Sequence, residues 1–241
     1  IAENFGKEPT LGMYLLNAFA GCLPASVVGK DFSLPMGWML ILIGCLFSTV
    51  TYPSKDLESE FGMQVMIRGR SRVRWWLSKC VWNLASVFIF FGILFLTAVV
   101  FCVCTKASLS MELNYDEALH LISNADMMPE GIPGWSVADL TIGLPALTAA
   151  ALCIWQMFIS ILWHPVYGFG AGVAVLIWSA YSQTPFAIGN YAMMQRLDIF
   201  CMSGMPVSSA WIVPVFLLAG VMAGCLVMKR RDILKLIRIG D

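Results

Sequence analysis

Long apolar runs alternate with short polar segments along this chain. Five runs are apolar enough to form membrane-spanning helices, and they cover residues 35–52, 77–105, 140–163, 166–181 and 210–228. A spanning helix needs about 20 mainly apolar residues. The pattern therefore predicts an all-α integral membrane protein, built as a bundle of five clear transmembrane helices.

The first 33 residues leave two alternatives open. The stretch 11–29 is apolar, but Gly12, Gly21 and Pro24 interrupt it. Glycine and proline break helical patterns. The stretch therefore fits either a poor span or a helix that lies in the outer membrane interface.

Composition supports the membrane assignment. Of the 241 residues, 59% are hydrophobic and 12% are charged, and the mean hydropathy is +0.78. Soluble domains are about 45–50% apolar and about 25% charged. We therefore expect membrane lipids, and no nucleic acid, among the partners of this chain.

Charge is unevenly distributed, although the formal net charge is zero. Two segments, 62–83 and 229–241, collect most of the basic residues: Arg68, Arg70, Arg72, Arg74, Lys79, Lys229, Arg230, Arg231, Lys235 and Arg238. Loops rich in Lys and Arg stay in the cytoplasm, and an even number of predicted spans separates the two segments. Both segments and the C-terminus are expected in the cytoplasm, with 106–136 and 182–209 on the outer side.

No motif typical of catalysis or metal binding is present. The sequence lacks HExxH, CxxC and GxxxxGK[ST], which mark zinc proteases, thiol or zinc sites and phosphate-binding loops. The eight cysteines lie mostly in apolar runs, and the two histidines, His120 and His164, are expected on opposite faces of the membrane. We expect no catalytic residue, no metal and no cofactor in this chain.

Four methionines fall in or near one outer segment: Met193, Met194, Met202 and Met205. A soft-metal site built on them would need histidine or cysteine partners at metal spacing, and none is present. A flexible apolar lining is the better interpretation, because methionine adapts to irregular gaps.

The basic loop predicts a helix start at Ser71, whose hydroxyl suits an N-cap. Arg72 and Arg74 then fall in the first turn, where cations oppose the helix dipole by about 0.3–1 kcal/mol each. Anionic lipid headgroups offset that cost at about 1 kcal/mol per basic residue. An acidic partner surface is the alternative.

Two glycine pairs with four-residue spacing occur in the last two runs. Gly168 and Gly172 form one pair, and Gly220 and Gly224 form the other. Such spacing places both glycines on one helix face and lets another helix approach closely. The approaching helix belongs either to this chain or to a second copy of it.

The 53–76 loop resembles a known arrangement. It reads as an acidic residue, a glycine, a short helix within 57–67, a Ser-Arg turn, and Lys79 at the start of the next span. This is similar to the cytoplasmic loop of type-2 ATP-binding-cassette (ABC) exporter permeases, and the resemblance covers the layout from about Pro35 onward. It implies that the short helix is a coupling helix that docks on an ATPase subunit. The residues carried over are Glu60, Gly62, Gln64, Val65, Met66, Ile67, Arg70, Ser71 and Arg72.

The family has six spans, both termini inside, and short outer helices before the last span. By this resemblance, residues 1–241 form one transmembrane permease domain with a coupling loop at 53–76, outer segments at 106–136 and 182–209, and a cytoplasmic tail at 229–241. The first family span would then lie before Ile1, with 1–33 as an outer or re-entrant segment.

The resemblance implies a permease subunit of an ATP-driven exporter in a bacterial plasma membrane. It would pair with a second permease copy or a relative and with a separate ATPase that binds ATP and Mg. The substrate would be a peptide, an amphiphilic drug or a lipid-like molecule. One alternative is a non-transporting immunity or sensor subunit. The other is an enzyme acting on lipids or prenyl groups, which the lack of clustered acids, bases or metal ligands disfavours.

Overall fold

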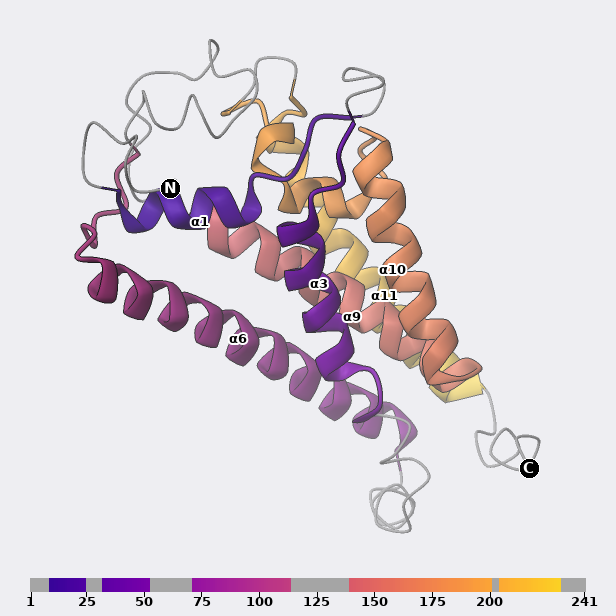
Figure 1. Ribbon diagram of the computed structural model, residues 1–241. Helices are drawn as coiled ribbons and strands as arrows, with labels where there is room; N and C mark the ends of the chain where they lie inside the picture. The colour runs from indigo at the N-terminus through magenta and orange to yellow at the C-terminus, as the bar shows by residue number, and fades with distance from the viewer. Residues whose placement is uncertain (1–8, 25–31, 53–70, 114–138, 201–203, 231–241) are drawn as a thin grey trace.

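The computed structural model describes residues 9–24, 32–52, 71–113, 139–200 and 204–230, and these residues are helical, with no β-strand (Figure 1). The α-helices are α1 (Leu11–Phe19), α3 (Met36–Thr49), α6 (Arg72–Thr105), α9 (Leu144–Leu162), α10 (Pro165–Tyr181) and α11 (Ile212–Arg230). One π-helix, η4 (Asp139–Gly143), precedes α9, and the 3-10 helices η5 (Ile188–Ala192), η6 (Met194–Arg196) and η7 (Val207–Trp211) lie between α10 and α11.

Three helical stretches are long and apolar enough to cross a membrane: Arg72–Thr105, Leu140–Leu162 and Val207–Arg230. The other two predicted spans are shorter, because α3 has 14 residues and α10 has 17. At 1.5 Å per residue these helices are about 21 and about 26 Å long, against a hydrocarbon core of about 30 Å. The prediction of an all-helical chain with membrane-spanning helices is confirmed for the described residues, but three helices rather than the predicted five are long enough to span.

The helix α9 lies at the centre of the bundle. Fourteen of its 19 residues are buried, and α3, α6, α10 and α11 all pack against it. Its first half is rich in alanine, with Ala146, Ala149, Ala150 and Ala151 buried. Small side chains let neighbouring helices approach closely in an apolar medium, so this run suits the most crowded position.

A proline explains the π-helix before α9. Pro145 falls within the predicted span 140–163, where a proline inside a helix would remove one backbone hydrogen bond. The structure places it in the first turn of α9 instead, directly after η4. A proline has no N–H to donate and is tolerated in a first turn, so the α-helical hydrogen bonding starts anew there.

The helix α1 is too short to span, since its nine residues cover about 14 Å. Thr10 caps it by accepting a hydrogen bond from the Met13 N–H at 3.3 Å. It packs through Leu11 and Leu15 on Cys102 near the Thr105 end of α6, and Figure 1 shows it crossing between that end and the rest of the bundle. The short helix predicted within 57–67 lies outside the described residues.

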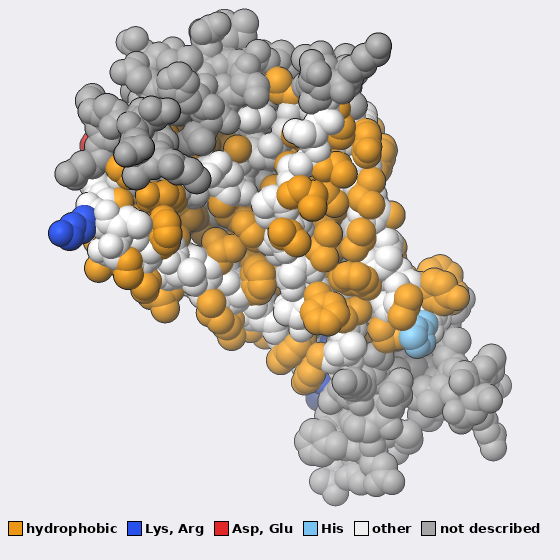
Figure 2. All heavy atoms as spheres, viewed as in Figure 1, with side chains coloured by type: hydrophobic (Ala, Val, Ile, Leu, Met, Phe, Trp, Pro, Cys, Tyr) orange, Lys and Arg blue, Asp and Glu red, His pale blue; other side chains and the backbone are white. Residues whose placement is uncertain are grey.

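The described parts of the two basic segments, 71–83 and 229–230, lie at one end of the bundle. Met228 of α11 packs with Trp75 and Trp76 of α6, so the start of α6 and the end of α11 are neighbours, as the even number of predicted spans requires. We call this end the basic end, and its described basic residues are Arg72, Arg74, Lys79, Lys229 and Arg230. Apolar side chains cover the visible middle of the bundle (Figure 2).

Candidate functional site

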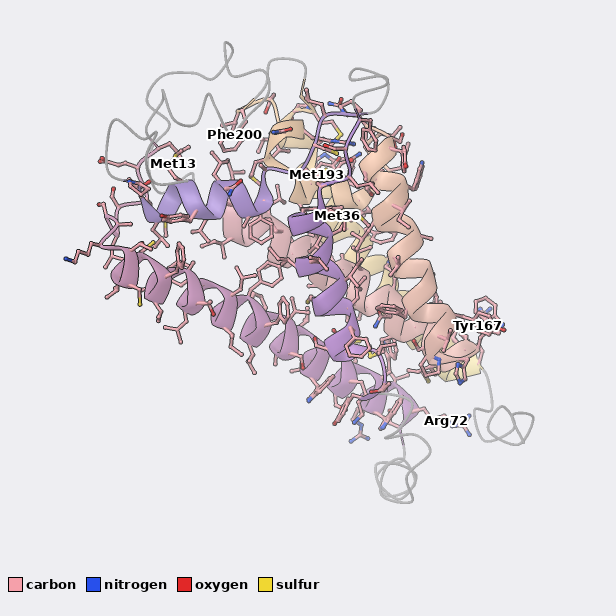
Figure 3. The ribbon with its side chains drawn as sticks, viewed as in Figure 1. Met13, Met36, Arg72, Tyr167, Met193 and Phe200 are labelled. Atoms are coloured by element: carbon pink, nitrogen blue, oxygen red, sulfur yellow. The ribbon has the colours of Figure 1, made fainter. Side chains whose placement is uncertain are left out.

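The predicted coupling residues fall mostly outside the described part of the chain. Glu60, Gly62, Gln64, Val65, Met66, Ile67 and Arg70 are outside it, and Ser71 and Arg72 are inside it. Ser71 is extended and its hydroxyl accepts a hydrogen bond from the Arg74 N–H at 3.4 Å, which confirms the predicted N-cap. Arg72 follows it at the basic end of the bundle (Figure 3).

The residue that precedes the 53–70 loop is fixed to α6 by an aromatic cluster around Lys79. Tyr52, at the end of the α3 segment, stacks on Trp82 of α6 with ring centroids 3.6 Å apart. The Lys79 ammonium donates to the Tyr52 hydroxyl at 3.2 Å and lies 4.7 Å from the centre of its ring. A cation over an aromatic face is attracted more strongly where water is excluded, and Lys79 is 8% exposed.

This cluster gives the loop a fixed base. Residues 52 and 71 flank the loop, and the Lys79–Tyr52–Trp82 contacts hold the flanking helices together. The sequence analysis placed Lys79 at the start of a span but did not predict its contact with Tyr52. The available signal was the three-residue spacing of Lys79 and Trp82, which places them on one face of α6.

All four predicted packing glycines contact helices of the same chain. A Cβ added to Gly168 would meet the Gln156 carbonyl oxygen of α9, and one added to Gly172 would lie 3.1 Å from the Leu46 side chain of α3. A Cβ added to Gly220 would lie 3.0 Å from the Ile154 side chain of α9. These faces are therefore occupied within the chain, which leaves no room there for a second copy.

Gly224 makes the tightest of these contacts. A Cβ at this position would overlap the indole ring of Trp76, which is itself fully buried and donates to the Val221 carbonyl at 2.9 Å. The glycine thus admits a tryptophan from α6 against the backbone of α11. This contact fastens the two basic segments at the same end of the bundle.

Buried polar side chains join the helices in the middle of the bundle. The Asn83 amide of α6 donates to the Cys153 carbonyl at 3.2 Å. The Gln156 amide of α9 donates to the Leu46 carbonyl of α3 at 2.8 Å, and the Thr49 hydroxyl of α3 donates to the Cys153 sulfur of α9 at 3.5 Å. Hydrogen bonds of this kind between membrane helices are worth about 0.6–2 kcal/mol, so they supplement the packing.

The end of the bundle opposite the basic end holds a buried arginine, Arg196, that the sequence analysis did not single out. Arg196 is fully buried among backbone carbonyls, and its burial lowers the pKa of its guanidinium from the ordinary value. Met193 and Met194 beside it are also fully buried. These methionines fill the core of the outer segment, as an apolar lining would, and no metal-binding cluster of His, Cys, Asp or Glu occurs among the described residues.

Comparison of the chain with protein-family models, curated proteins and solved structures found no match in any of the three. The family resemblance consequently rests on the layout of the sequence alone.

The close contact between Trp76 and Gly224 predicts that a larger side chain at position 224 destabilises the fold. Gly224→Leu should lower the free energy of unfolding by about 1–3 kcal/mol, the usual range for overpacking, because its side chain competes with the buried indole. The matched control is Gly92→Leu, since Gly92 is an exposed helical glycine of α6 with open space around it. Thermal unfolding of both purified variants measures the difference, and equal stability would show that the Gly224 face is not tightly packed.

Proposed function

We propose that this chain is the membrane-spanning permease subunit of an ATP-driven exporter of the ABC type. A separate ATPase subunit binds ATP and Mg, and the chain itself catalyses nothing. Its substrate is a peptide, an amphiphilic drug or a lipid-like molecule. The proposal rests on the sequence layout and on one structural observation, the fixed base of the 53–70 loop.

A loop that transmits force from an ATPase needs rigid attachment to the membrane helices. The stacked Tyr52 and Trp82 rings, with Lys79 against Tyr52, join the chain where the loop leaves α3 to the side of α6, about two to three turns after the loop re-enters at Ser71. A displacement of the loop would therefore move both helices together. The apolar residues Val65, Met66 and Ile67 of the loop then offer the docking face, with Arg70, Ser71 and Arg72 at its end.

The source of energy is consistent with this assignment. The helices α3, α9 and α10 contain no Asp, Glu, Lys, Arg or His, and Lys79 lies near the end of α6. Ion-coupled transporters place such residues near the middle of the membrane. An energy supply from a partner subunit suits the apolar interior better. The 3-10 helices between α10 and α11 also agree with the short outer helices of the family.

A second permease copy would need a face other than the glycine pairs. The short helices α3 and α10 pack side by side, with Phe47 of α3 edge-on to Phe169 of α10. Helices shorter than the bilayer are accommodated by thinning of the membrane or by association. Their outward surface carries Leu40, Phe47, Tyr167 and Trp178 around the open Gly170, and Tyr167 points away from the bundle (Figure 3). We assign the second permease copy to this surface, where association would help both short helices to cross the membrane.

Cross-linking tests that surface. In a chain whose native cysteines are replaced, Gly170→Cys should form a disulfide-linked dimer upon oxidation in membranes, because small residues lie near the crossing point of paired helices. Gly92→Cys, on the exposed side of α6, is the matched control and should remain monomeric. Cross-linking at Gly92 rather than at Gly170, or at neither, would contradict the assignment.

Impermeant thiol labelling tests the orientation. In the same cysteine-free background, Glu112→Cys should be labelled from outside intact cells, because the segment 106–136 is predicted to be external, and Arg74→Cys should react only after the cells are opened. Both positions are exposed in the structure. The opposite pattern would place the basic end outside and remove the loop from any cytoplasmic ATPase.

The coupling residues are tested by two variants with opposite expectations. Met66→Asp should abolish co-purification of the ATPase, because an unpaired charge in a buried contact costs several kcal/mol. Arg70→Ala combined with Arg72→Ala should weaken it less and in a salt-dependent manner. Membrane insertion should be unchanged in both. ATPase binding and nucleotide hydrolysis at low and high salt measure the effect.

If the loop binds only lipid, the order reverses and the arginine variant is the more damaging. A complex that tolerates Met66→Asp with unchanged hydrolysis would remove the main support for a permease. Absence of any co-purifying nucleotide-binding protein with the unaltered chain would favour the immunity or sensor subunit instead.

A further inference from the structure

The segment containing α1 crosses the end of the bundle opposite the basic end, and it is fastened on both sides. At its beginning, the Leu11 N–H donates to the Ser108 carbonyl at 2.9 Å and the Thr10 hydroxyl donates to the Glu112 carbonyl at 2.8 Å. These bonds join α1 to the chain that follows α6. At the last residue of α1, Phe19 stacks on Phe91 of α6 with ring centroids 6.0 Å apart.

The other side is fastened by Arg196. Its guanidinium donates to the Cys22 carbonyl at 2.9 Å, to the Ser179 carbonyl at 2.7 Å and to the Ala180 carbonyl at 2.6 Å. It also donates to the Ser182 carbonyl at 2.9 Å and to the Asn190 side-chain oxygen at 2.7 Å. One side chain thus joins the loop after α1, the end of α10 and η5.

The chemistry of this site favours a cation without a countercharge. The carbonyls of Ser179, Ala180 and Ser182 belong to the end of α10, where carbonyl groups lack helical partners and the dipole is negative. Among the described residues Arg196 has no carboxylate partner. Because all its acceptors are neutral, water can replace them one for one when the contact opens, and opening leaves no buried anion unpaired.

The backbone turn at Gly21 directs the Cys22 carbonyl, in the loop after α1, toward Arg196. Gly21 has a φ of +77°, and a Cβ there would lie 2.6 Å from Met193. Glycine adopts this left-handed conformation without steric cost. The turn brings the Ala20 carbonyl to the Gln195 N–H at 3.0 Å and the Cys22 carbonyl to Arg196.

We propose that Arg196 is a releasable latch that holds the α1 segment across this end of the bundle. A nine-residue helix is marginal by itself, so α1 depends on its two fastenings and on its buried face, whose Met13, Leu16 and Phe19 lie in the main core. When the latch opens, α1 and the loop after it separate from α10 and from η5 and η6, while α6, α9 and α11 stay packed. The latch is a property of the folded chain and holds whether or not the chain is a permease.

Hydrogen–deuterium exchange of the full chain in lipid nanodiscs tests this latch. Arg196→Ala should raise amide exchange about tenfold in peptides covering 11–23 and 188–200, the local opening unit. Peptides covering 72–91 and 212–228 should be unchanged. Gly21→Ala should give the same pattern from the α1 side, because the added methyl group strains the turn and meets Met193.

Asp198→Asn is the matched control, since it changes one charge two residues away on a side chain that bonds only the Val207 N–H at 3.0 Å in the described chain. It should leave the exchange of 11–23 unchanged. Arg196→Lys, which keeps the charge but reaches fewer carbonyls, should give an intermediate increase. Unchanged exchange of 11–23 in both Arg196→Lys and Gly21→Ala, or an equal increase in all peptides, would overturn the latch. These two variants decide the matter if Arg196→Ala does not fold.

Discussion

Close approach to α9 is the constraint on which the rest of this structure depends. In an apolar medium water provides no drive for helices to associate, so the bundle relies on contact between closely fitting surfaces. Buried alanines along α9, and glycines on α10 and α11, supply that fit. A few buried amides and hydroxyls, among them Asn83 and Gln156, add directional bonds between helices.

The two ends of the bundle are built on different physical principles. At the basic end, aromatic rings surround a buried lysine, and Trp76 fills the space that Gly224 leaves open. At the other end, a buried arginine satisfies the carbonyls that end α10. The first arrangement ties the helices on either side of a loop, and the second ties a short helix to the outer segment.

This contrast also separates rigid from releasable parts. The stacked rings of Tyr52 and Trp82, and the Trp76 indole packed against Gly224, lose their contacts completely when the helices separate. An arginine bound to neutral acceptors exchanges those bonds for bonds to water, and its opening leaves no buried carboxylate without a partner. The basic end is therefore suited to transmitting displacement, and the α1 end is suited to changing state.

The sequence by itself determined the membrane class, the all-α fold, the approximate positions of the helices and the Ser71 cap, because hydropathy and capping are local properties. It also placed both basic segments at one end, since that follows from the number of spans. Only the tertiary structure decided that α3 and α10 are short, that α1 lies across the bundle, and that the glycine pairs face their own chain. Only the tertiary structure brought Lys79 to Tyr52 and Arg196 to Cys22, because those contacts join residues 27 and 174 positions apart, and no local pattern specifies which distant partner a side chain meets.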